Sequence, residues 1–421
     1  MTQETPFQLS NWIGQGKSMA SALPRIHNIA KENFEIPQSI HYDIIPSPMM
    51  SIAKALEFPI PLECTSDDSP QPFQYFSMAA PDIMDKNTTV QRLRHLPILE
   101  AKVIRKLAQH SRQAWPNGSQ SVMYSHLGGV VAHYPLWLIS VWVAFLDFKR
   151  DVQGLWVKSS DWLAQQKVSK RNPVLVELVD EARQILSMLP WGCVKPAGLS
   201  DTEAAFNLWC FLGPNWLASS QQNNMLELIR QKVDADPALA GKIRVEGVNL
   251  TPKIIKVFEA GADTYRTTRS FRWIRELFDD LLRDKAALIT TAHLGKITKE
   301  PHWAGLVVDA SKPVTQILYA DSFGKTIPPS LFAAFRWVVD QHTTAAQSVG
   351  KLPVGPQQDG FSCGMLINNS LQHFVDPAIP LSKAGQNFAR ACLVAFNKLG
   401  KSMLERLEIA RAAAIQEDED S

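Results

Sequence analysis

The chain has 421 residues, of which 45% are hydrophobic and 20% are charged, with a formal net charge of +2. This length is ample for a packed core and indicates two domains, or three. The near balance of charge provides no strong attraction toward nucleic acid or an anionic membrane, so neither is an expected direct partner.

The cysteines are odd in number and irregularly spaced, at Cys64, Cys193, Cys210, Cys363 and Cys392. No pair has zinc-ligand or Cys-x-x-Cys spacing, which favours a reducing intracellular setting, the nucleus or cytoplasm, over a disulfide framework. We expect no metal and no other cofactor. The first residues lack the basic and apolar segments of a signal peptide. The longest apolar run, 134–148, is too short to span a bilayer and predicts a buried helix.

Residues 1–90 contain many prolines and few periodic runs, which predicts an irregular and partly disordered region. Residues 91–194 form a predicted helical region of unknown role. Apolar residues at helical spacing predict a helix after Pro97 within residues 92–110 and another over about 174–189, in addition to the apolar run. The stretch after 189 resembles a linker, so we place the start of a C-terminal domain near residue 195.

The C-terminal domain, 195–414, mixes helical patterns with strand-like runs and is followed by an acidic tail over 415–421. Three apolar runs rich in β-branched residues, 286–294, 302–310 and 314–322, are joined by short connections and predict adjacent strands of one small central sheet. Periodic apolar residues, or a proline pair at the start, predict helices over 215–233, 270–284, 327–342 and about 384–414. The expected fold class is therefore α+β.

The segment PVGPQQDGFSCGMLINNSLQHF, residues 353–374, is typical of a site built around an activated thiol. Cys363 comes just before an apolar, helix-compatible stretch, and the dipole at a helix N-terminus favours the reactive thiolate. The amide of Gln357 could lie beside the sulfur and, with the backbone N–H of Cys363, form an oxyanion hole. Gly360 would let the backbone turn between them.

A reactive cysteine also needs a base and a group that orients the base. His302 and Asp321 each lie at the edge of a predicted strand, in HWAGLVVDA and ILYADSFG. His293 and His373 are weaker candidates for the base because no tryptophan follows them. Gln358 is the rival of Gln357. For every one of these positions, an ordinary structural role is the alternative.

Three motifs, HW at 302–303, ADSFG at 320–324 and QQDGFSCG at 357–364, together resemble the ubiquitin-like-protein proteases, the SUMO-specific cysteine proteases. The resemblance covers about half of the chain. It implies a papain-like fold in circularly permuted order, with a helix that carries the nucleophile. It also implies His302 as base, Asp321 as its orienter, Gln357 as oxyanion donor and Cys363 as nucleophile.

The family cleaves after the C-terminal Gly-Gly of a ubiquitin-like modifier, so the resemblance implies a SUMO-like modifier and its conjugates as partners. Trp216 and Trp303 match tryptophans that close a narrow channel over the two glycines, and core packing is the alternative for both. The acidic residue that follows the first tryptophan in the family is absent, because Ala218 and Ser219 stand there. Asp359 replaces the usual Asn, and Ser362 replaces a common Asp.

Two further functions remain open. A catalytically silent module that binds a modifier or serves a mobile element would retain the fold without turnover. An acyl transferase with a Cys-His pair is a less favoured third reading.

Overall fold

A computed structural model of the protein describes residues 15, 24–64, 72–82, 86–124, 131–168, 172–194, 203–382 and 388–419. The chain divides into two compact units, Met1–Val157 and Lys158–Ser421. The predicted domain boundary near residue 195 stays a prediction. Part of the proline-rich region that we expect to be irregular, and the last two residues of the acidic tail, lie outside the described residues.

The first unit packs helices against a small antiparallel sheet of order β1-β2-β3. The strands are β1 (Phe76–Ser77), β2 (Ser121–Tyr124) and β3 (Ala132–Pro135). Its helices are α1 (Pro24–Phe34), α2 (Gln38–Ile44), α3 (Ile52–Glu57), α4 (Lys86–His95), α5 (Ala101–Ala114) and α6 (Leu138–Phe148), with a short 3-10 turn, η3 (Pro72–Tyr75). Trp142 of α6 is buried in this core and contacts Tyr124 edge-on at 5.5 Å.

Two sequence predictions in this unit are tested directly. The apolar run over 134–148 forms a buried helix, α6, as predicted. The helix predicted after Pro97 within 92–110 is α5, which begins at Ala101, and a separate helix, α4, ends at His95 before the proline. Pro97 explains the break, since a proline disfavours helical backbone in the residue before it and supplies no N–H of its own.

Around the junction of the units, α6 continues through a π-helical turn, η4 (Lys149–Gln153), into α7 (Gly154–Val168). The second unit then adds α8 (Pro173–Met188), the short strands β4 (Cys193–Val194) and β5 (Glu203–Ala204), and the 3-10 helix η5 (Ala205–Phe211). Asn172 caps α8 by accepting a hydrogen bond from the backbone N–H of Leu175.

The centre of the second unit is a five-stranded sheet of order β10-β9-β8-β7-β6. Its strands are β6 (Ile243–Val245), β7 (Ala287–His293), β8 (Trp303–Asp309), β9 (Thr315–Ala320) and β10 (Gln347–Lys351). The three predicted strands are β7, β8 and β9, and they are neighbours in one sheet, as predicted; the structure shows that they pair antiparallel. Both edge strands, β6 and β10, pair in parallel with their neighbours.

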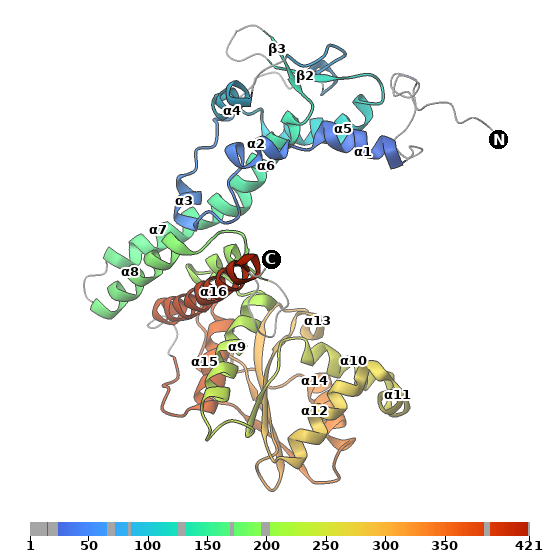
Figure 1. Ribbon diagram of the computed structural model, residues 1–421. Coiled ribbons are helices and arrows are strands. Elements are labelled where there is room, and N and C mark those ends of the chain that lie inside the picture. Colours follow the sequence, from blue (N-terminus) through green and yellow to red (C-terminus); the bar gives the residue numbers. More distant parts are fainter. Residues whose placement is uncertain are drawn as a thin grey trace, which may run out of the picture. The chain divides into compact units, whose positions relative to one another are not determined.

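Helices cover both faces of this sheet (Figure 1). One face packs on α10 (Leu250–Ala260), α12 (Arg272–Arg283) and α14 (Pro329–Asp340), and the other packs on α9 (Ser219–Ala235) and α15 (Cys363–Val375). Because side chains alternate along a strand, Leu288 faces the first layer whereas Ala287 and Ile289 face the second. The short helices α11 (Ala262–Thr267) and α13 (Gly295–Thr298) and the 3-10 turn η6 (Arg269–Phe271) complete the layers.

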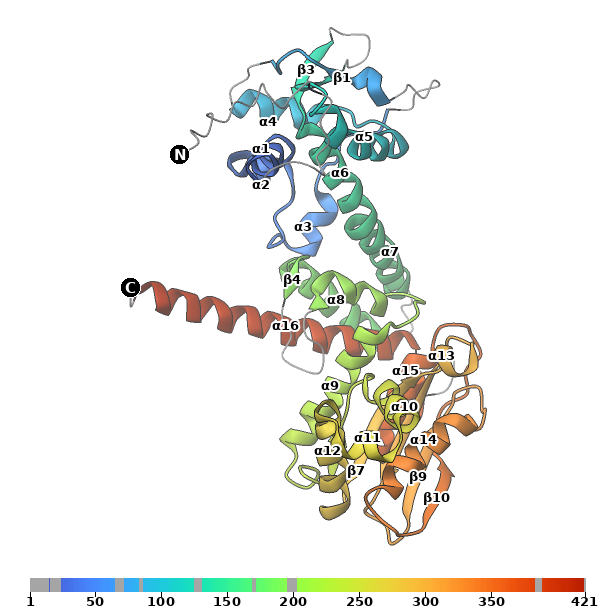
Figure 2. The ribbon, with the colours of Figure 1, turned by 90° about the vertical axis from the view of Figure 1, so that its right-hand side faces the viewer.

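A long C-terminal helix, α16 (Phe388–Glu419), packs beside α8 (Figure 2). The amide of Asn397 donates a hydrogen bond to the carbonyl oxygen of Leu178 at 3.0 Å, and Lys401 forms an ion pair with Glu181. The helix continues through most of the segment that we expect to be an acidic tail. The second unit is therefore an α+β domain with the central small sheet that the sequence indicates.

Candidate active site

Cys363 is the first residue of α15, a helix of 13 residues, and its side chain is 1% exposed. The backbone N–H groups of a helix's first turn have no partner within the helix and carry partial positive charge. A thiolate at this position is therefore stabilised by the helix that carries it. The sulfur lies among core residues of the α9 and α15 layer, where access to water is small.

His302 and Asp321 meet because two antiparallel strands bring them to the same end of the sheet. His302 immediately precedes β8, and Asp321 immediately follows β9, its antiparallel neighbour. Nε2 of His302 lies 3.3 Å from Oδ1 of Asp321, and both side chains are buried. The contact is close but not well aligned as a hydrogen bond, which is common at catalytic sites before a substrate binds.

The environment of His302 favours its charged form. Burial would lower the pKa of the imidazole, but polar contacts with the Asp321 carboxylate and the Cys363 thiol outweigh it and raise the pKa to about 9. Because Nε2 faces Asp321, Nδ1 is the ring nitrogen that remains for the thiol. His302 thus interacts with two of the other three predicted catalytic residues, Asp321 and Cys363.

Asp321 is held as a charged carboxylate by its neighbours. Burial would raise its pKa, but contacts with His302, the backbone N–H of Phe323 and the hydroxyl of Tyr319 lower it below the usual range. The N–H of Phe323 donates to Oδ1 at 2.8 Å, and the Tyr319 hydroxyl donates to Oδ2 at 3.2 Å. These bonds fix the carboxylate so that it can orient the imidazole.

Gln357 is buried, 9% exposed, whereas its rival Gln358 is exposed. Its Nε2 donates a hydrogen bond of 2.7 Å to the backbone carbonyl of Asp359, and its Oε1 accepts one of 2.8 Å from the hydroxyl of Ser322. Nε2 also makes a long contact of 3.4 Å with Oδ1 of Asp359, so the second N–H of the amide has only a weak acceptor, which a stronger one could replace.

Asp359, which stands where the family usually has Asn, organises the loop that leads to Cys363. Its Oδ1 accepts hydrogen bonds from the backbone N–H groups of Phe361 at 2.9 Å and Ser362 at 2.7 Å. The backbone bends at Gly360, as expected, but the bend does not require glycine, because its φ is not positive and an added Cβ would meet nothing within 4 Å. The turn is held by the Asp359 carboxylate, a type of local bond that Asx residues commonly make.

Three rings cluster near the base. His293, the last residue of β7, lies between Trp216 and Trp303, with ring centroids 5.7 Å and 5.0 Å away. Trp303 is fully buried, and its indole N–H donates to the carbonyl oxygen of Leu217 at 2.7 Å. Trp216 is half-buried. A cavity of about 640 Å³ opens beside His293 and Trp303.

Sequence reasoning missed two neighbours of the catalytic set. The ring of Phe323 stacks on the imidazole of His302, with centroids 4.9 Å apart, and is 51% exposed. Ser322 is buried and bonds to Gln357 as described above. Both belong to ADSFG, the motif that contains Asp321, so the signal was present in a segment already singled out.

The competing candidates have structural surroundings. Nδ1 of His373 lies 2.6 Å from the carbonyl oxygen of Ile379. Cys392 is fully buried, which raises the pKa of its thiol, and Cys64 contacts the hydroxyl of Tyr124 in the first unit. The side chain of Cys193 lies outside the described residues.

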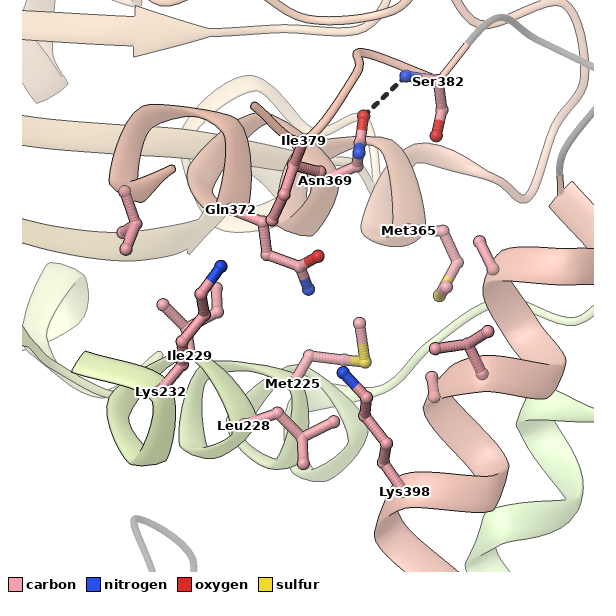
Figure 3. Close-up of a pocket in the computed structure, with 14 residues that line it drawn as sticks. Met225, Leu228, Ile229, Lys232, Met365, Asn369, Gln372, Ile379, Ser382 and Lys398 are labelled. Atoms are coloured by element: carbon pink, nitrogen blue, oxygen red, sulfur yellow. Dashed lines mark hydrogen bonds between the residues drawn. The ribbon is translucent and has the colours of Figure 1, made fainter. Parts of the chain in front are cut away.

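Another cavity, of about 240 Å³, lies on a different side of α15, where that helix faces α9 and α16 (Figure 3). Met365, Asn369 and Gln372 of α15 line it, together with Met225 of α9 and Lys398 of α16. None of the four predicted catalytic residues is among its lining residues. Among the described residues, no group of three or more His, Cys, Asp or Glu side chains could hold a metal ion.

Comparison with solved structures finds proteins of the kind that the motifs resemble. The yeast Ulp1 protease domain, solved in complex with the SUMO orthologue Smt3, is 15% identical, with a TM-score of 0.38 over 54% of this chain and 96% of that one. The Chaetomium thermophilum Ulp1-like SUMO protease domain is 15% identical, with a TM-score of 0.37 over 58% of this chain and 88% of that one.

The Xanthomonas campestris effector XopD, solved bound to ubiquitin, is 14% identical, with a TM-score of 0.30 over 42% of this chain and 90% of that one. No protein-family model and no curated protein matches the chain. The chain is thus similar to SUMO proteases, but at these identities and TM-scores the similarity assigns neither activity nor substrate. In the described part of the chain, no helix is both long and apolar enough to cross a bilayer.

Proposed function

We propose that the chain is a cysteine peptidase that cleaves a ubiquitin-like modifier, SUMO-like in kind, after its C-terminal Gly-Gly. It would act as a deconjugating isopeptidase, a precursor-processing endopeptidase, or both. The observation that carries the proposal is the contact of a buried imidazole with both a carboxylate, 3.3 Å away, and a thiol at a helix N-terminus. The order His302, Asp321, Gln357, Cys363 would be that of a papain-like site in circularly permuted form. This order is compatible with the proposed reaction, because the geometry of such a site defines it and the order along the chain does not.

The first half of the reaction forms a thioester. The Cys363 thiolate attacks the carbonyl carbon of the modifier's terminal glycine, a C–S bond forms, and the carbonyl oxygen becomes an oxyanion. His302, protonated at the start, donates its proton to the departing amine as the C–N bond breaks. Asp321 holds the ring in position and favours the imidazolium.

The second half releases the modifier. Water attacks the thioester carbonyl, the neutral His302 accepts a proton from that water, and the C–S bond breaks to return the thiolate. In both halves the oxyanion would lie between the backbone N–H of Cys363 and the second N–H of Gln357, which in the free protein makes only a long contact with Oδ1 of Asp359. The fixed bonds of Gln357 to Ser322 and Asp359 support this role, because a donor that is already oriented need not reorganise during the reaction.

Selection for glycine would come from the aromatic cluster. Trp216 is half-buried and would cover the substrate tail. Trp303 would support it by its hydrogen bond to Leu217, the residue next to Trp216. Only residues without a side chain would pass a channel bounded by such rings. This proposal predicts that substitution of the last two glycines of a substrate abolishes cleavage.

The direct test is cleavage of a panel of modifier precursors and modifier–lysine conjugates by the full chain. The expected result is release at the Gly-Gly terminus of at least one SUMO-like member. Cys363→Ser, which keeps the shape of the side chain, should still bind that substrate and cleave none of it. Equal cleavage by Cys363→Ser would refute the assignment.

The other two functions are outcomes of the same experiment. Binding of a modifier without cleavage by the wild-type chain would support the non-catalytic module. Acetylation of Cys363 by acetyl-CoA, detected as a mass increase on intact protein, would instead support an acyl transferase.

A further inference from the structure

We infer that Ser322 is a positioning residue for the oxyanion donor, and that it links the loop carrying Asp321 to the loop carrying Gln357. This inference rests on the proposed function, because it assigns a role within that reaction. Ser322 follows Asp321 directly and is 2% exposed. It is not itself expected to touch the substrate.

Two hydrogen bonds join Ser322 to Gln357 across 35 positions of sequence. The backbone N–H of Gln357 donates to the carbonyl oxygen of Ser322 at 2.7 Å, and the Ser322 hydroxyl donates to Oε1 of Gln357 at 2.8 Å. The backbone and the side chain of the same glutamine are therefore both tied to one serine. A single contact would leave the amide free to rotate, whereas this pair restrains it.

The surroundings of Gln357 also determine which end of its amide faces which way. The backbone carbonyl of Asp359 can only accept, so the amide group 2.7 Å from it must be the NH₂. The other end is then the oxygen, and the Ser322 hydroxyl is the group that satisfies it. With Oε1 occupied in this way, the amide keeps a fixed orientation, and an oxyanion would replace the long 3.4 Å contact of Nε2 with Oδ1 of Asp359.

Loss of the Ser322 hydroxyl would leave Oε1 buried without this donor and let the amide turn. The electrostatic contribution of an oxyanion donor depends on its being oriented before charge develops. Because that charge is present in the transition state and not in the bound substrate, the effect should fall on kcat while KM is retained. We expect Ser322→Ala to lower kcat about tenfold, the size expected for one buried hydrogen bond.

A double-mutant cycle separates this role from a general structural one. The rate of cleavage of a modifier–aminocoumarin amide is measured for wild type, Ser322→Ala, Gln357→Ala and the double variant. If Ser322 acts through Gln357, Ser322→Ala lowers the cleavage rate no further once Gln357 is already alanine. Additive losses of about tenfold in both backgrounds would overturn the inference, as would wild-type kcat in the single variant.

Alkylation of Cys363 by iodoacetamide gives a second readout, because this reaction needs the thiolate and no oxyanion hole. Ser322→Ala should retain the wild-type alkylation rate at neutral pH while it loses turnover. A parallel fall in alkylation would mean that the substitution disturbs Asp321 and His302, and would contradict the inference. The proposed peptidase function fails separately, if wild type and Cys363→Ser cleave the amide alike.

Ser370 offers a matched control. It is also a fully buried serine whose hydroxyl donates one hydrogen bond, to the carbonyl oxygen of Pro353 at 2.6 Å. Ser370→Ala should lower the melting temperature by a similar amount and leave kcat within about twofold of wild type. If Ser322→Ala proves much less stable than this control, Ser322→Cys takes its place in the cycle, because a thiol keeps the volume but donates weakly.

Discussion

The indole N–H of Trp303 donates a hydrogen bond to the carbonyl oxygen of Leu217 across 86 positions of sequence, at 2.7 Å. The residue that follows the predicted base is thereby joined to the residue that follows Trp216. The start of β8 and the segment before α9 are thus held together on the side of the sheet that carries Cys363.

Trp303→Phe removes this bond but keeps an aromatic ring in the core. It should lower the free energy of unfolding by about 1–3 kcal/mol, the usual cost of leaving a buried acceptor unpaired. Displacement of Trp216 should also raise KM for a modifier substrate. Trp337→Phe is the control, since that indole packs on Phe258 without a hydrogen bond among the described residues. Equal effects on KM from both variants would contradict the account.

Gly364 and Gly360 make a matched pair on either side of Cys363, the proposed nucleophile. A Cβ at Gly364 would lie 2.2 Å from Nε2 of Gln222, whose own Oε1 is held by Asn368 at 2.6 Å. Gly364→Ala should therefore shift the first turn of α15 and lower kcat/KM at least about tenfold, because a displacement of about 1 Å at a reacting group can cost a hundredfold.

At Gly360 an added Cβ would meet nothing within 4 Å, so Gly360→Ala should leave kcat/KM and the melting temperature nearly unchanged. Steady-state kinetics and thermal unfolding of both variants provide the comparison. A tolerant Gly364 together with a sensitive Gly360 would reverse the expected order.

The pH dependence of activity follows from the imidazole. Its pKa is raised to about 9, so kcat/KM should fall as pH rises through about 9 and His302 loses the proton that supports the thiolate. The interaction of charged His302 with Asp321 also contributes to the free energy of unfolding. That contribution is fully present below the ordinary imidazole pKa of about 6.5 and is lost as pH rises through about 9.

Asp321→Asn removes the carboxylate that helps to raise the pKa of His302, so the fall in kcat/KM at high pH should move to lower pH. A profile of kcat/KM from pH 5 to 10 for both proteins measures the shift. An unchanged high-pH limb in Asp321→Asn would show that Asp321 does not support the imidazolium.

Gln357→Ala should lower kcat by about 10²–10³, the usual effect of removing one oxyanion donor, with a smaller change in KM. Gln358→Ala, one residue along and exposed, should have almost no effect. Single-turnover kinetics on a modifier amide measures the acylation step itself. Comparable losses in the two variants would assign the role to the loop as a whole rather than to Gln357.

Much of this architecture could be predicted from local pattern. The strands β7 and β8 are almost continuously buried, and β9 alternates between buried and partly exposed residues before its buried end. Apolar runs of this kind with β-branched residues are easily recognised. The helices α12 and α14 also match their predicted ranges closely. The edge strand β10, QSVGK, was missed because an edge strand can stay partly exposed, so its hydrophobic pattern is weak.

The site was predictable as a set of residue types but not as a set of contacts. Cys363, His302 and Asp321 each lie at an element boundary, which sequence motifs mark well. The bond between Ser322 and Gln357 and the stacking of Phe323 on His302 depend on how loops fold back, and no local period records this. Gly360 is the opposite case: glycine suggests an unusual backbone conformation, but the φ of Gly360 is not positive.

The central claim is that Cys363 is the nucleophile of a site that accepts a modifier's C-terminus. A panel of SUMO-like and ubiquitin probes with a C-terminal electrophile, followed by mass mapping of the adduct, tests it most directly. The account predicts an adduct of at least one SUMO-like probe on Cys363, slowed strongly by His302→Ala and lost in Cys363→Ala. No adduct from any probe at neutral pH, or an adduct on Cys64 or Cys210 instead, would contradict it.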